Sequence, residues 1–71
     1  MLNVRGLYDT LVSRGVQIDH HESDLYFPVT EETKALVSDF EHSEIVKTFT
    51  SEGKLWYDVP FGYIPWWKGE V

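Results

Sequence analysis

Cysteine is absent from this sequence of 71 residues, and several classes of protein are excluded with it. The chain has no disulfide, no thiol nucleophile and no cysteine-based zinc site. No segment approaches the roughly 18–20 apolar residues that cross a membrane. Residues 1–14 mix Arg5, Asp9 and Arg14 with apolar side chains, unlike the apolar centre of a signal peptide. We therefore expect a complete small cytoplasmic protein with no membrane contact.

Cations are also scarce, with 6 Lys and Arg against 12 Asp and Glu and a net charge of −6. Residues 19–44 hold eight carboxylates and the single cation Lys34, which gives this stretch a charge of −7. Such a surface repels nucleic acid and attracts a basic protein. We expect no direct contact with nucleic acid. A solvated acidic face that only keeps a small protein soluble is the alternative.

Two helices are predicted from the apolar spacing. Residues 4, 7, 8 and 11 follow the helical period between a capping Asn3 and a terminating Gly15. The second helix begins after Thr30, carries its apolar stripe at residues 33, 36, 37 and 40, and is expected to end near residues 41–42. Glu31 and Glu32 lie in its first turn, where the helix dipole favours negative charge.

Strands are predicted where apolar residues alternate. Residues 16–18 suggest a short strand, and residues 25–29 form a strand in which Pro28 marks an edge or an end. Residues 45–50 and 55–61 form a hairpin around a turn with Gly53 at positive φ. The sequence thus predicts one α+β domain over residues 1–71, of order α-β-α-β-β, with two helices packed on a short, mostly antiparallel sheet.

The run Asp19-His20-His21-Glu22-Ser23-Asp24 is the densest polar cluster in the chain. His20, His21, Glu22 and Asp24 are candidate ligands for zinc or another divalent metal, in a structural or hydrolytic role. Adjacent residues of an extended chain point to opposite faces, so His20 and His21 do not readily hold one ion. Two alternatives remain: a solvated turn or strand start in which the aspartates cap backbone N–H groups, and a surface that binds a partner.

Catalytic motifs are missing from the sequence, which has neither a glycine-rich phosphate loop nor a nucleophile elbow. A histidine beside carboxylates suits a general base, but nothing marks a nucleophile. We predict no catalytic residue, no cofactor and no enzyme activity.

Seven of the eleven aromatic residues lie in residues 45–71. Trp56 and Tyr57 are expected in the core of the hairpin. Residues 60–71 alternate turn formers with Tyr63, Trp66 and Trp67, which predicts an irregular aromatic tail. These three side chains either cover a thin core or anchor a partner. A homo-oligomer in which the tail packs on its twin is a third alternative.

The string His20-His21-Glu22-Ser23-Asp24-Leu25-Tyr26, followed by Pro28-Val29-Thr30, resembles a group of small uncharacterised phage and prophage proteins. The segments Lys54-Leu55-Trp56-Tyr57-Asp58-Val59-Pro60-Phe61 and Pro65-Trp66-Trp67 are similar to the same group. This resemblance implies a phage origin and a compact protein in the host cytoplasm, and it implies no activity.

Together these observations predict a small acidic module that binds and inhibits a basic host protein. The target would be the transcription machinery or an anti-phage defence complex such as CRISPR, with the carboxylates imitating a phosphate backbone. The predicted partner-binding residues are Asp19, His20, His21, Glu22, Asp24, Glu31, Glu32, Tyr63, Trp66 and Trp67.

Overall fold

The computed structural model describes residues 1–22 and 24–60 and confirms an α+β fold. Its elements in chain order are α1 (Val4–Ser13), β1 (Asp19–His21), β2 (Asp24–Pro28), α2 (Glu31–Ser38), the 3₁₀ turn η1 (Ser43–Ile45), β3 (Lys47–Ser51) and β4 (Lys54–Val59). The four strands form one antiparallel sheet of order β1-β2-β4-β3.

One strand was not predicted as such. Asp19–His21 form the edge strand β1, where the sequence predicted a turn or strand start, and residues 16–18, which suggested a strand, belong to none. The strand β2 ends at Pro28, as predicted, but it lies inside the sheet, paired with β1 and β4. The remaining strand boundaries differ from the prediction by one or two residues, and residue 61 lies outside the described residues.

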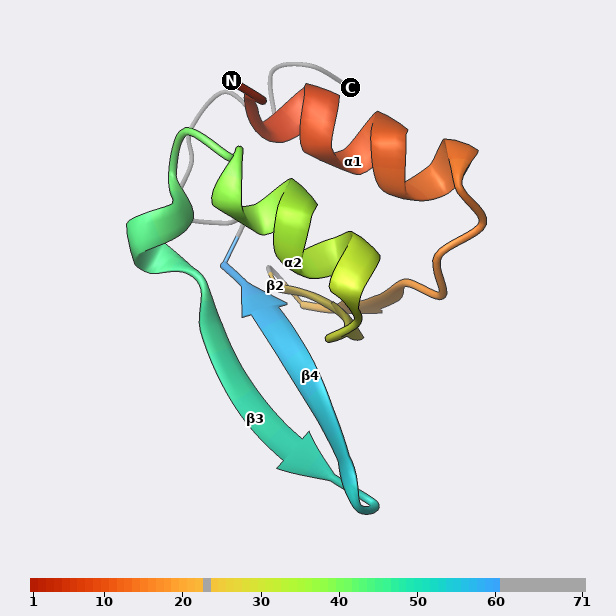
Figure 1. Ribbon diagram of the computed structural model, residues 1–71. Coiled ribbons are helices and arrows are strands. Elements are labelled where there is room, and N and C mark those ends of the chain that lie inside the picture. The colour runs from red at the N-terminus through yellow and green to blue at the C-terminus, as the bar shows by residue number, and fades with distance from the viewer. Residues whose placement is uncertain (23, 61–71) are drawn as a thin grey trace.

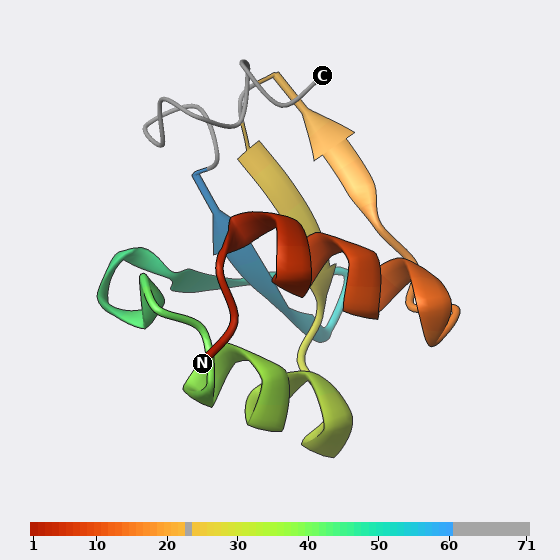
Figure 2. The same ribbon diagram turned by 90° about the horizontal axis from the view of Figure 1, so that it is seen from above.

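Both helices cover the same face of the sheet (Figure 1, Figure 2). The core lies between these two layers, and nine buried apolar residues build it: Val4, Leu7, Leu11, Leu25, Phe27, Leu36, Val37, Phe40 and Val59. Strand residues alternate between the faces, so Leu25 and Phe27 point to the helices and Tyr26 points away. No helix in residues 1–22 and 24–60 covers the opposite face, and we call this face the open face.

Side-chain hydrogen bonds fix where each helix begins. The Gly6 N–H donates to Asn3 Oδ1 at 2.7 Å, as expected of an N-cap. Thr30 and Thr33 form a capping box at the start of α2. The Thr33 hydroxyl also donates to the Pro28 carbonyl at 2.7 Å, which joins the end of β2 to α2.

The second helix ends at Ser38, three to four residues earlier than predicted, and Phe40 is buried outside the helix. The segment after α2 pairs instead with the N-terminus: Leu2 N–H donates to the Asp39 carbonyl at 2.7 Å, and Glu41 N–H donates to the Leu2 carbonyl at 2.8 Å. This contact ties the beginning of α1 to the end of α2.

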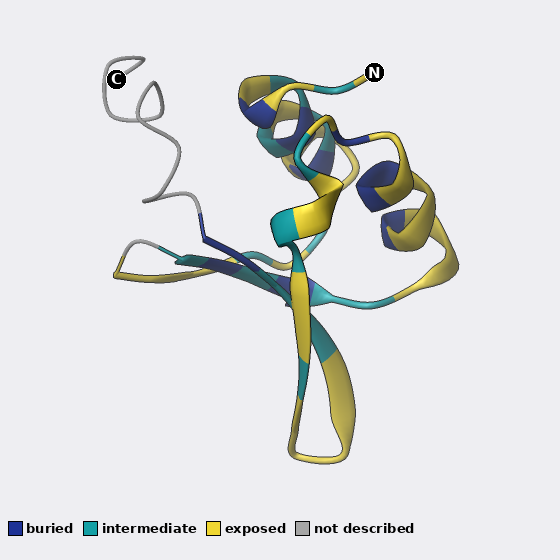
Figure 3. Ribbon diagram, turned by 90° about the vertical axis from the view of Figure 1, so that its left-hand side faces the viewer, coloured by how far each residue is buried: buried dark blue, intermediate teal, exposed yellow. Residues whose placement is uncertain are grey.

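The β3–β4 hairpin extends away from the helices as an arm (Figure 1, Figure 3). Its turn residues Glu52 and Gly53 have φ of 55° and 73°, the left-handed geometry of a tight hairpin turn. Gly53 was predicted to adopt positive φ, and Glu52 was not.

Candidate functional site

The open face of the sheet carries a row of polar side chains that crosses all four strands. Asp19 of β1 pairs with Tyr26 of β2, Tyr26 pairs with Asp58 of β4, and Asp58 pairs with Lys47 of β3. Residues directly opposite in a sheet point to the same face. The register therefore brings Asp19 and Asp58, which are 39 residues apart in sequence, to the two sides of Tyr26.

Four rings on the same face form a continuous series, which we call the aromatic ladder: His21, Tyr26, Phe49 and Trp56. The His21 and Tyr26 rings stack with centroids 5.1 Å apart, and Tyr26 meets Phe49 edge-on at 4.8 Å. Phe49 and Trp56 lie directly opposite on β3 and β4, with nearly parallel rings (12°) and centroids 6.5 Å apart. The ladder thus crosses from β1 to the arm.

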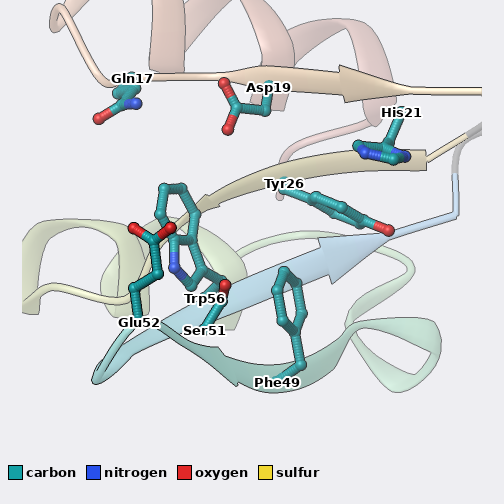
Figure 4. Close-up of a pocket in the computed structure, with 8 residues that line it drawn as sticks. All are labelled: Gln17, Asp19, His21, Tyr26, Phe49, Ser51, Glu52 and Trp56. Atoms are coloured by element: carbon teal, nitrogen blue, oxygen red, sulfur yellow. The ribbon is translucent and has the colours of Figure 1, made fainter.

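A hollow of about 340 Å³ lies over the ladder. Besides the four rings it is lined by the polar residues Gln17, Asp19, Ser51 and Glu52 (Figure 4). Asp19 belongs to one edge strand of the sheet and Glu52 to the turn beside the other, so carboxylates border the hollow from two sides. The hollow therefore combines an aromatic floor with a polar rim.

Asp24 and Asp58 form a carboxyl pair beside the ladder. Burial, a hydrogen bond with Asp24 and the negative charge of Asp24 together raise the pKa of Asp58 to about 6, while Lys47 acts in the opposite direction. Burial and the charges of Asp58, Asp24 and Glu22 also raise the pKa of the Tyr26 hydroxyl. The open face is therefore negative enough to disfavour further ionisation of its own groups.

Two buried polar atoms of this face have no hydrogen-bond partner within the described residues: Trp56 Nε1 and Asp58 Oδ1. An unmade hydrogen bond of a buried group costs about 1–3 kcal/mol. The indole N–H requires an acceptor and the carboxylate oxygen requires a donor.

The two histidines of the predicted cluster point to opposite faces. His21 lies in the ladder, whereas His20 pairs with the buried Leu25 and lies 6.0 Å from the Tyr8 ring of α1. In the described part of the chain, no three His, Asp or Glu side chains are close enough together to hold one metal ion. Of the four candidate ligands, His21 and Asp24 are thus paired across β1 and β2, whereas His20 lies on the other face.

The predicted acidic surface is divided between two places. Asp19 and Asp24 lie on the open face, and Glu22 is close enough to act on Tyr26. Glu31 and Glu32 lie on α2. Glu31 forms an ion pair with Lys34 at 3.4 Å, and Glu32 forms one with Arg14 at 3.1 Å. Part of the negative charge on α2 is therefore neutralised by the chain itself. Tyr63, Trp66 and Trp67 lie outside the described residues.

Sequence reasoning missed the ladder. Trp56 was assigned to the core together with Tyr57; Tyr57 does pack against the core, but Trp56 lies half-buried on the open face. The alternation along β2 and β4 contained this signal, because Tyr26, Trp56 and Asp58 alternate with core residues. That Phe49 and Trp56 are neighbours follows only from the register in which β3 and β4 pair.

No family model matches this chain, and neither a curated protein nor a solved structure matches it. Neither helix in residues 1–22 and 24–60 is long and apolar enough to cross a membrane.

Proposed function

We propose that this protein is a small acidic protein-binding module whose partner presents a basic surface. The observation that carries the proposal is the open face, where an aromatic ladder lies among carboxylates and is covered by neither helix of the described part of the chain. Aromatic side chains provide most of the binding energy at many protein interfaces, and complementary charge accelerates the encounter.

The resemblance to small phage proteins extends this proposal to the partner and the effect. The partner is then a host protein, in transcription or in an anti-phage defence complex such as CRISPR, whose basic surface normally holds nucleic acid. Binding of the module occupies that surface and inhibits the host protein in the host cytoplasm. Tyr63, Trp66 and Trp67 remain predicted anchors of the same interface.

Affinity capture from bacterial lysate tests the proposal. The full chain is compared with a variant that carries Asp19→Asn, Glu31→Gln, Glu32→Gln and Glu52→Gln, all exposed positions outside the core. We expect one stoichiometric partner that binds the original chain, is released by salt and is lost by the variant. Addition of the original chain should then displace nucleic acid from the purified partner. Capture of the same proteins by both chains would contradict the proposal.

A further inference from the structure

We propose that the hollow over the aromatic ladder binds the side chain of an arginine carried by an extended basic segment of the partner protein. This inference rests on the proposed function and specifies the chemical group that the open face recognises. The guanidinium lies against the rings of Phe49 and Trp56 and between the carboxylates of Asp19 and Glu52.

The rings provide the first argument. Phe49 and Trp56 differ in plane by only 12°, so their faces are oriented alike and suit a flat group. Lys54 Nζ of the chain itself lies over the indole, 5.2 Å from its centroid, which shows that this ring accepts a cation. A guanidinium is planar and weakly hydrated, and it stacks on aromatic faces better than an ammonium group does.

The charges around the hollow provide the second argument. Asp19 and Glu52 line it, and Asp24 and Asp58 lie next to the Tyr26 ring. A guanidinium donates paired hydrogen bonds to carboxylates while it stacks on a ring. Nucleic-acid bases also stack on such rings, but their phosphates would face these carboxylates, and so the charge favours a cationic peptide.

The unpaired buried atoms indicate a peptide rather than a free cation. Within the described residues, Trp56 Nε1, which belongs to the lining of the hollow, lacks an acceptor, and Asp58 Oδ1, on the same face but outside that lining, lacks a donor. A guanidinium supplies donors only, so it cannot satisfy the indole N–H. A backbone carbonyl next to the arginine supplies the missing acceptor. The volume of about 340 Å³ is at the lower end for ligand sites and fits one side chain with its adjoining backbone.

The backbone at Glu52 agrees with a binding role for its side chain. Glu52 has a φ of 55°, a conformation in which Asn, Asp and Gly are less strained than glutamate. Strained residues tend to occur at functional sites. A glutamate in this turn makes the hairpin less stable and places a carboxylate at the hollow.

The test is a titration of the ¹⁵N-labelled full chain with a short Gly/Ser peptide that carries one central arginine, followed by NMR. We expect shifts at the indole N–H of Trp56, assigned with Trp56→Phe, and at backbone amides of the ladder residues. The same peptide with citrulline, which has the shape of arginine without its charge, should not bind, and the lysine peptide should bind several-fold more weakly.

Variants locate the site. The double variant Asp19→Asn/Glu52→Gln should raise the dissociation constant about tenfold or more, equivalent to about 1.4 kcal/mol. Glu44→Gln removes a charge at an exposed position of η1 that does not line the hollow, and it should leave the constant unchanged. Each variant's spectrum must first show an intact fold.

Several results would overturn the proposal: no binding at millimolar peptide, equal binding of the citrulline peptide, or shifts away from the ladder. It would also fail if an oligonucleotide occupied the ladder, or if Trp66→Ala/Trp67→Ala shifted the ladder signals of the free protein, because residues 61–71 would then be the occupant. If the arginine peptide fails while Asp19→Asn/Glu52→Gln still captures the partner from lysate, only the arginine site is wrong and the protein-binding function stands.

Discussion

Asp24 and Asp58, on the neighbouring strands β2 and β4, are joined by a side-chain hydrogen bond on the open face. Two carboxyl groups form such a bond only when one of them is protonated, and the protonated Asp58 is the donor. The pair is therefore most stable when it shares one proton. At neutral pH this proton is largely lost, and two negative charges remain close to each other.

The first prediction concerns this pair and the pH dependence of stability. The pKa of Asp58 is about 6 in the folded chain and about 3.9 in an unfolded one, so the folded state binds more protons between these values. The contribution of Asp58 to the free energy of unfolding thus falls as the pH rises through this window.

Asp58→Asn supplies a permanent donor for Asp24 without the charge. We expect it to raise the stability at pH 7 by on the order of 1 kcal/mol, or roughly 4–8 °C in Tm, and to lose this advantage towards pH 4. Thermal melts of both chains across this range check the result. An advantage of equal size at every pH would contradict it.

The second prediction concerns Thr33, whose buried hydroxyl accepts from the Thr30 N–H at 2.8 Å and donates to the Pro28 carbonyl at 2.7 Å. Thr33→Val preserves the shape of the side chain but removes the hydroxyl to which the Thr30 N–H and the Pro28 carbonyl are bonded. We therefore expect a loss of about 1–3 kcal/mol in the free energy of unfolding. Urea denaturation measures the loss. Thr48→Val, at an exposed position of β3, is the matched control and should change stability by about 0.5 kcal/mol at most.

The third prediction separates strain from charge at Glu52. Glu52→Asn should stabilise the protein by about 0.5–1 kcal/mol, because asparagine adopts positive φ more readily and Asn-Gly is a preferred hairpin turn. Glu52→Gln removes the charge but keeps the strain, so it should leave stability nearly unchanged. Both should weaken arginine-peptide binding. Equal stability of the two variants would disprove the role of strain.

The fourth prediction concerns the tail. Trp66→Ala/Trp67→Ala should abolish capture of the partner while the NMR spectrum of residues 1–60 keeps its dispersion, because tryptophans at an interface contribute disproportionately to binding. An unfolded double variant would instead make the two tryptophans part of the core.

Much of the fold was predictable because local signals agree with it. Asn3 and Thr30 cap the helices where the sequence placed them, and Gly53 marks the turn of the arm. The strand β1 was missed because Asp19–His21 are all exposed, so no apolar alternation reveals them. Such a strand exists through its backbone pairing with β2 rather than through burial.

The candidate site was predicted only in part, for a different reason. The sequence identified Asp19, His21 and Asp24, which belong to one continuous polar run. It did not identify Phe49, Trp56 or Asp58 as their neighbours, because that proximity depends on which strands pair and in which register. The end of α2 was placed too late because a buried Phe40 extends the apolar stripe beyond the helix.

Because both helices lie on one side of the sheet, the two faces are subject to different constraints on substitution. The strands β2 and β4 contribute Leu25, Phe27 and Val59 to the core, and the side chains that alternate with these take no part in packing the helices. Residues such as Asp19, His21 and Phe49 can thus be exchanged without rebuilding the core. The same scaffold could acquire a new partner through a few substitutions on one surface, while the other surface preserves the fold.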